Sequence, residues 1–103
     1  MKKIQDDQIS LKELNLAATI FNCLAHPTRL EIANLLEDGK SKTVGHILSE
    51  VDVEPTLLSH HLAKMKNSGI LESFRKGRYV FYRLTTKEIK PIFSYVQNLS
   101  RNN

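Results

Sequence analysis

Residues 55–67 carry side chains suited to nucleic-acid contact along one side of a predicted helix. At about 100° per residue, one face is mostly apolar and comprises Leu58, His61, Leu62 and Met65. The opposite face is polar and free of acids.

Hydroxyl and imidazole groups can meet base edges in the major groove, whereas lysines and helix termini bind phosphate. We therefore predict base or near-base contacts by Thr56, Ser59 and His60, and phosphate contacts by Lys64 and Lys66. His61 is expected to pack or hydrogen bond inside the protein. The alternative is an ordinary amphipathic helix whose polar face meets only solvent.

A second group of cations follows this helix. Residues 70–75 and 79–84 are rich in aromatic and β-branched side chains, which is typical of a two-stranded hairpin with Gly77 in its turn. The tip of this hairpin is predicted to carry Arg75, Lys76 and Arg78, which can reach phosphates or enter a minor groove. The alternative is a turn whose charges serve only solubility.

The net charge of the 103-residue chain is +4, and it is unevenly distributed. Residues 54–84 contain six basic and two acidic side chains, so this segment carries the whole excess. The rest of the chain contains nine of each and is neutral. This distribution is expected when one surface faces a polyanion, although a solvated charge cluster has the same count.

The elements that position these residues are predicted from periodicity and capping signals. Ser10 and Glu13 match a capping box at the start of a helix over 10–24. A second helix is expected from Pro27 until Gly39 ends it. The remaining helices are expected over about 43–51, 55–68 and 86–100, the last capped by Thr85 or Thr86. Two helices, a tight break, a recognition helix and a hairpin form a winged helix-turn-helix. We predict one domain over 1–103, mainly α with a two-stranded β wing.

The first and last of these helices are too apolar for one packing surface. Leu11, Leu16 and Ile20 widen the apolar face of the helix over 10–24. In the last helix, Ile92, Phe93 and Val96 have no obvious partner within so short a chain. We therefore expect a homodimer joined by helices 10–24 and 86–100.

Several motifs resemble those of the ArsR/SmtB-type bacterial regulators. They occur in the family's order at residues 24–32 (LAHPTRLEI), 58–62 (LSHHL), 68–71 (SGIL) and 77–82 (GRYVFY). The resemblance covers about residues 14–99. It implies a dimer built from the first and last helices, and usually repression that an inducer relieves.

The sequence departs from that family where many members bind metal. Some members bind arsenic or other soft metals through cysteines of the third helix, but residues 43–47 (TVGHI) contain none. Others bind zinc through Asp, His and Glu of the last helix, and from Lys87 onward this chain offers only Glu88. We therefore expect no metal site of the family type and no cofactor. A small-molecule inducer is one alternative source of a signal.

Cys23 is the only cysteine of the chain. A single thiol cannot form an intrachain disulfide or a multi-thiolate metal site. The simplest interpretation is a small buried apolar residue. Its position at the end of the first helix, near the expected dimer interface, leaves redox sensing as a second interpretation.

Other classes of function find little support in the sequence. No apolar run approaches the roughly 18 residues of a membrane span, and the N-terminus has no apolar signal core, so we expect a cytoplasmic protein. A phosphate-binding glycine loop and a Cys/His nucleophile arrangement are both absent, which argues against an enzyme. The leading prediction is a sequence-specific transcriptional regulator that binds an inverted repeat in double-stranded DNA. The alternative is a winged-helix module for protein–protein contact.

Overall fold

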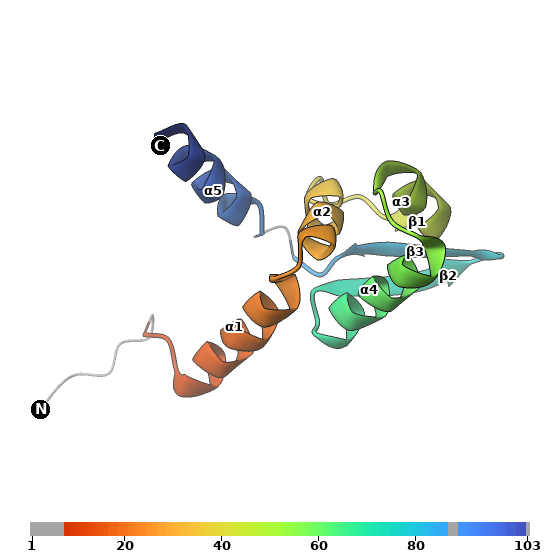
Figure 1. Ribbon diagram of the computed structural model, residues 1–103. Helices are drawn as coiled ribbons and strands as arrows, with labels where there is room; N and C mark the ends of the chain where they lie inside the picture. The colour runs from red at the N-terminus through yellow and green to blue at the C-terminus, as the bar shows by residue number, and fades with distance from the viewer. Residues whose placement is uncertain (1–7, 87–88, 103) are drawn as a thin grey trace, which may run out of the picture.

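The computed structural model describes residues 8–86 and 89–102, which form helices around one small sheet (Figure 1). The elements in chain order are α1 (Leu11–Leu24), α2 (Pro27–Leu35), β1 (Lys42–Thr43), α3 (Val44–Glu50), α4 (Pro55–Asn67), β2 (Leu71–Lys76), β3 (Tyr79–Leu84) and α5 (Lys90–Asn102). The predicted mainly α fold with a hairpin wing is confirmed.

Side-chain caps fix where the first four helices begin. Ser10 and Glu13 form the predicted capping box, because each side chain accepts the backbone N–H of the other, at 3.1 and 2.8 Å. The side chains of His26, Thr43 and Glu54 cap α2, α3 and α4 by accepting backbone N–H groups of the first turn, without the reciprocal bond of a capping box. Proline is the first residue of both α2 and α4, where its missing N–H costs nothing.

The wing is an antiparallel hairpin of β2 and β3, and a short third strand completes the sheet. Lys76 pairs with Tyr79, and Gly77 turns the chain at a φ of +62°, which glycine adopts without strain. Strand β1 lies on the other side of β3 and ties the entry to α3 to the wing. Strand β1 was not predicted from the sequence, because two residues are too few to show a period.

The hydrophobic core lies between the helices α1 to α4 and the base of the wing. Its fully buried large side chains are Ile32, Leu36, Ile47, Leu58, Leu62, Met65 and Leu71. Three of these belong to α4, so burial of one face of α4 is central to the fold.

Helices α1 and α5 project from this body on the side opposite the wing tip (Figure 1). Their exposed large apolar side chains include Leu11, Leu14, Leu16 and Phe21 on α1 and Ile92, Tyr95, Val96 and Leu99 on α5. No residue of α5 itself is fully buried. Phe93 is partly buried and packs against the core, so the expectation that it lacks a partner within the chain is wrong. The chain alone therefore leaves two apolar helix faces without a covering partner among the described residues.

Two boundaries differ from those expected. Helix α2 ends at Leu35 and is followed by a turn up to Gly39, whose φ is +81°. Helix α5 begins only at Lys90, later than expected, and Thr85, one of the two predicted caps, has other partners. The Thr85 hydroxyl instead donates to the carbonyls of Gly69 and Ile70, at 2.8 and 3.2 Å, and so joins the end of β3 to the start of β2.

Across the described ranges, no helix is long and apolar enough to span a lipid bilayer.

Candidate nucleic-acid interface

Helix α4 presents its polar face to solvent, as its periodicity predicted. The predicted contact residues Thr56, Ser59, His60, Lys64 and Lys66 are all exposed. Ala63 is also exposed between them, so no large side chain stands in the middle of this face. The opposite face is buried, and Leu58, His61, Leu62 and Met65 lie on it. The exposed face can therefore enter a groove without loss of core packing.

The N-terminus of α4 is already occupied by a carboxylate. Glu54 accepts the backbone N–H groups of Thr56 and Leu57, at 3.1 and 3.2 Å. These hydrogen bonds lower the pKa of Glu54, the bond from Thr56 having the largest effect. The backbone N–H groups that an anion would use at this helix terminus are therefore satisfied internally.

The wing tip carries exposed cations beside an aromatic ring. Arg75, Lys76 and Arg78 are exposed, as predicted. The Arg78 guanidinium donates to the Tyr79 hydroxyl at 3.1 Å, and its carbon lies 5.3 Å from the centre of the Tyr79 ring. Tyr79 was not singled out in the sequence, although an aromatic residue directly after a basic turn is a usable signal.

Lower on the hairpin, Arg83 is neutralised. It forms an ion pair with Glu72 across the two strands. Among the described residues, Lys64, Lys66, Arg75, Lys76 and Arg78 form no ion pair. All five predicted cations are therefore available for an external anion, as are the exposed Lys12, Lys40, Lys90 and Arg101 elsewhere in the described part of the chain.

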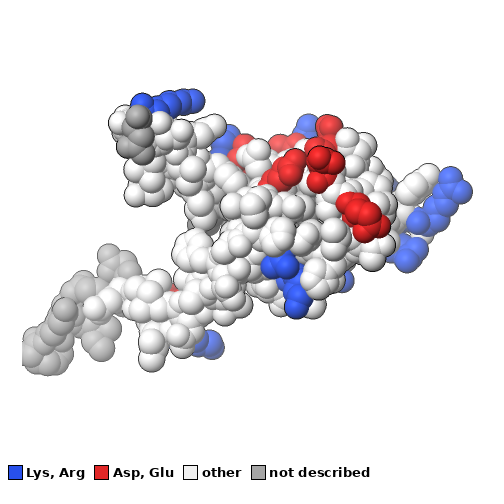
Figure 2. Space-filling model, in the orientation of Figure 1, with Lys and Arg blue, Asp and Glu red and all other residues white. Residues whose placement is uncertain are grey.

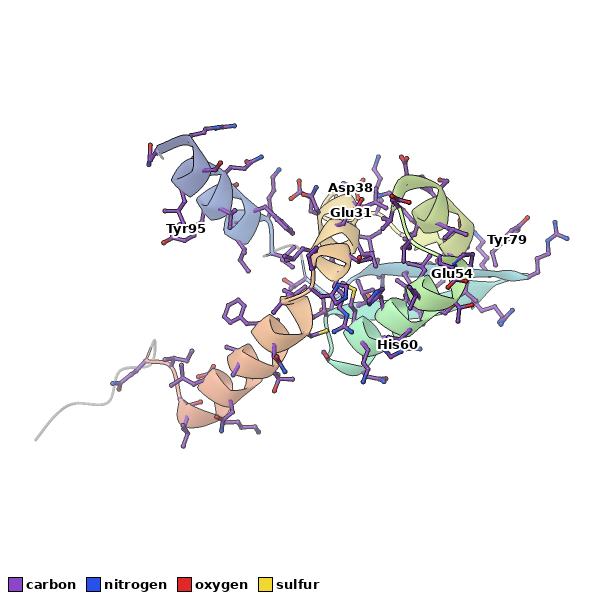
Figure 3. The ribbon with its side chains drawn as sticks, in the orientation of Figure 1. Glu31, Asp38, Glu54, His60, Tyr79 and Tyr95 are labelled. Atoms are coloured by element: carbon purple, nitrogen blue, oxygen red, sulfur yellow. The ribbon has the colours of Figure 1, made fainter. Side chains whose placement is uncertain are left out.

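Acidic side chains gather on one part of the visible face. Figure 2 shows them over α2 and α3, with a few Lys or Arg side chains beside them, whereas the wing tip and the lower edge near α4 carry Lys and Arg alone. In Figure 3, Glu31 and Asp38 lie above α2, whereas His60 points away from the body on the far side of α4. This separation favours one orientation toward a polyanion, with the α4 face and wing leading.

His61 lies at the centre of a polar cluster inside the fold. It is 5% exposed, and its Nδ1 accepts a hydrogen bond from Arg29 Nε at 3.1 Å. The His26 ring lies 4.5 Å from the His61 ring, between centroids. Burial lowers the pKa of His61, and the nearby charges of His26, Arg29 and His60 lower it further. His61 is therefore held neutral, in agreement with the internal role predicted for it.

Cys23 lies in the core beside this cluster. Its side chain is buried, its Sγ donates to the carbonyl of Lys64 at 3.8 Å, and the Arg29 guanidinium donates to the same Sγ at 3.8 Å. This position fits the simpler interpretation, a small buried apolar residue. Redox sensing by Cys23 stays a prediction.

Metal ligands are not brought together in the described part of the chain. No group of three or more His, Cys, Asp or Glu residues is arranged there to hold a metal ion. Glu88, the acid noted in the last helix, lies outside the described residues.

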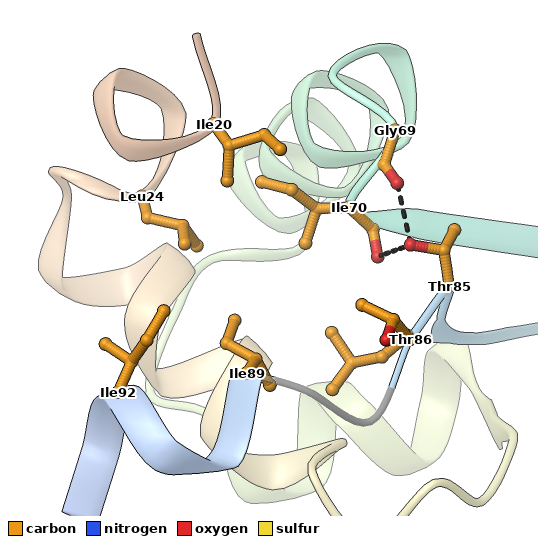
Figure 4. A pocket seen from close by; sticks show the side chains of 9 residues that line it. Ile20, Leu24, Gly69, Ile70, Thr85, Thr86, Ile89 and Ile92 are labelled. Carbon is orange, nitrogen blue, oxygen red and sulfur yellow. Dashed lines mark hydrogen bonds between the residues drawn. The ribbon is translucent and has the colours of Figure 1, made fainter. Parts of the chain in front are cut away.

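An apolar cavity of about 160 Å³ lies where α1 and α5 leave the body (Figure 4). Ile20 and Leu24 of α1 form one wall, and Ile89 and Ile92 form the opposite wall. The floor includes Ile70, at the turn that joins the recognition helix α4 to the wing. No charged residue is among the described residues of the lining.

Comparisons with known proteins agree with this geometry. Residues 26–73 match the family described as bacterial regulatory protein, arsR family. The chain is 35% identical over 83 residues to an uncharacterised HTH-type transcriptional regulator of Methanocaldococcus jannaschii, covering 81% of this chain and 93% of that protein. It is 29% identical over 79 residues to the transcriptional repressor SdpR of Bacillus subtilis, covering 77% and 87%.

A solved structure with the same fold is a homodimer. It is the homodimeric winged helix-turn-helix DNA-binding domain of a possible ArsR-family regulator from Mycobacterium bovis. Its TM-score with this chain is 0.73 at 27% identity, over 94% of this chain and 91% of that one.

The buried neutral His61 predicts an acid-dependent loss of stability. Unfolding frees His61 to take up a proton near its ordinary value of 6.5, whereas the folded state resists protonation. The stabilisation is fully present above pH 6.5 and is lost as the pH falls below 6.5 toward the lowered folded pKa. We expect His61→Asn to flatten the fall of unfolding free energy below pH 6.5 by at most about 1.4 kcal/mol per pH unit. Urea denaturation at a series of pH values measures this slope. His46→Asn, at an exposed site on α3, is the matched control, and a wild-type slope in His61→Asn would contradict the assignment.

Proposed function

The chain belongs to the arsR family of winged helix-turn-helix transcriptional regulators, and we propose that it is a repressor that binds an inverted repeat in double-stranded DNA as a homodimer. The observation that carries this proposal is the pairing of an acid-free exposed face on α4 with unpaired cations at the wing tip. We place its action in the cytoplasm, where such a protein meets chromosomal DNA.

Helix α4 and the wing tip have different roles in the proposed DNA contact. Ser59 and His60 carry groups that hydrogen bond base edges, and they lie on the exposed face of α4. Arg78 and its neighbours at the wing tip supply charge, which attracts any DNA backbone or an adjacent minor groove. Specificity is therefore assigned to α4, and sequence-independent affinity to the wing and the lysines of α4.

The homodimer is supported by the exposed faces of α1 and α5. On α5, Ile92, Tyr95, Val96 and Leu99 follow a spacing of three, one and three residues, which places them on one side of the helix. Apolar stripes of this kind mark an interface. The Mycobacterium bovis relative is homodimeric, so the same assembly is proposed here. A dimer also supplies two α4 helices, one for each half of an inverted repeat.

The inducer is proposed to be a small uncharged apolar molecule that enters the cavity between α1 and α5. A cavity of about 150 Å³ lined by aliphatic side chains is known to hold benzene, so a volume of about 160 Å³ suits one ring. The cavity touches both dimer helices and the turn after α4. A molecule bound in the cavity can therefore change the position of α4 relative to the dimer interface.

Substitutions on α4 and on the wing should have different effects. Ser59→Ala and His60→Ala are each expected to cost about 1–3 kcal/mol on a selected operator and little on random DNA. Arg78→Ala should weaken both and lower the salt slope, since it removes phosphate contacts. Fluorescence anisotropy with both duplexes at matched salt measures these losses, with Ser94→Ala on α5 as control. Equal losses on both duplexes for all three variants would contradict the separate roles proposed for α4 and the wing.

A charge on the exposed stripe of α5 should separate the dimer. Val96 is 55% exposed, so Val96→Glu leaves the core intact but places a carboxylate in the proposed interface. We expect this variant to sediment as a folded monomer and to lose operator binding. Ser94→Glu, on the opposite side of α5, should remain dimeric. A wild-type protein that is monomeric at micromolar concentration would rule the dimer out.

Occupation of the cavity is tested with toluene. We expect toluene to raise the melting temperature and to weaken operator binding by the wild-type protein. Ile20→Phe fills the cavity from one wall and should remove both responses, whereas Lys12→Phe, at an exposed polar position of α1, should keep them. No toluene binding by the wild-type dimer would show that the cavity is not the inducer site.

A further inference from the structure

Two motifs far apart in the sequence meet inside the fold. Residues 26–29 (HPTR) begin α2, and residues 59–62 (SHHL) lie in the middle of α4. Arg29 and His61 are 32 residues apart, and their side chains are joined by a 3.1 Å hydrogen bond. Neither residue is fully exposed, and neither has been given a role in DNA contact above.

Arg29 holds more than one element at this point. Its Nε donates to His61 Nδ1 on α4, and its Nη1 donates to the backbone carbonyl of Cys23 at 3.2 Å. Cys23 is in the last turn of α1, where helix carbonyls have no partner within the helix. One planar guanidinium therefore ties the end of α1 to the middle of α4, while its own backbone is part of α2.

These contacts link the two surfaces on which the proposed function depends. Helix α1 belongs to the proposed dimer interface, and His61 is adjacent in sequence to His60 on the DNA-facing side of α4. A rotation of α4 relative to α1 changes the distance between the two recognition helices of a dimer. The separation of half-sites that a dimer accepts follows that distance.

We propose that Arg29 is a positioning residue that sets the angle between α1 and the recognition helix, and thereby the half-site spacing that the dimer recognises. This inference rests on the proposed function. The chemistry requires arginine, because a fork of N–H donors reaches two acceptors in different directions at once. It also requires an acceptor at His61 Nδ1, which neutral His61 supplies when its proton is on Nε2.

Arg29→Lys is the central test, because it keeps the charge and removes the fork. Binding is measured on a library of duplexes in which the two half-sites of the selected operator are separated by different numbers of base pairs. We expect about a tenfold loss on the preferred spacing, a smaller loss on random DNA, and a broader range of accepted spacings. The matched control is Arg83→Lys, since Arg83 bonds only Glu72 on the wing and should keep the preferred spacing.

Variants of His61 test the same contact from the other side. Asparagine has an acceptor oxygen close to where Nδ1 lies, whereas leucine has none. His61→Asn should retain the wild-type spacing preference, and His61→Leu should broaden it as Arg29→Lys does. Sedimentation and circular dichroism of each variant show whether it is a folded dimer, so a spacing change in a folded dimer supports positioning.

Two results separate failure of this inference from failure of the proposed function. A wild-type protein that binds no selected duplex overturns both. A wild-type protein that prefers one spacing, together with a folded Arg29→Lys dimer that keeps that spacing and loses affinity equally on operator and random DNA, overturns only the positioning role. The same holds if His61→Leu keeps the wild-type preference.

Discussion

Burial of one face of α4 is the constraint on which the rest of this structure depends. Leu58, Leu62 and Met65 are almost completely removed from water, and each buried aliphatic side chain contributes roughly 1.5–3 kcal/mol of transfer free energy. A helix rotates as a rigid unit, so burial of these residues fixes which others face outward. Core packing, rather than any property of the polar residues, therefore aims Ser59 and His60 at solvent. The same helix thus joins the stability of the fold to its proposed recognition of DNA.

Hydrogen bonds and ion pairs within the protein determine which charged side chains remain available to an external anion. The acids of the basic segment are both engaged: Glu54 caps α4, and Glu72 pairs with Arg83 across the wing. Neither is left to repel a phosphate backbone without compensation. In Figure 2, a group of acids from other segments lies over α2 and α3, away from the wing tip. A modest net charge of +4 is thereby concentrated on one side, where it acts at short range despite screening by salt.

The projecting helices carry the apolar surface that the proposed dimer would cover. A domain of about 100 residues buries only part of the surface its unfolded chain exposes, and here α5 contributes no fully buried residue. Residues such as Tyr95 and Leu11 are more than 60% exposed, which is unfavourable for large apolar side chains in water. The proposed dimer would cover them and bring two α4 helices together. In that proposal, a molecule bound in the apolar cavity at the bases of α1 and α5 would act on the interface and on α4 together.

The sequence by itself determined the order of the elements, the inner and outer faces of α4, and the cations of the wing. These follow from periodicity, capping residues and turn chemistry, which are local properties of the chain. It did not determine strand β1, which exists only because Lys42 and Thr43 meet Tyr82 and Phe81. Nor did it place Thr85, which bonds the start of β2 instead of capping a helix. The contact between Arg29 and His61 belongs to this second class, because a hydrogen bond across 32 residues depends on how α2 packs against α4 and leaves no local pattern.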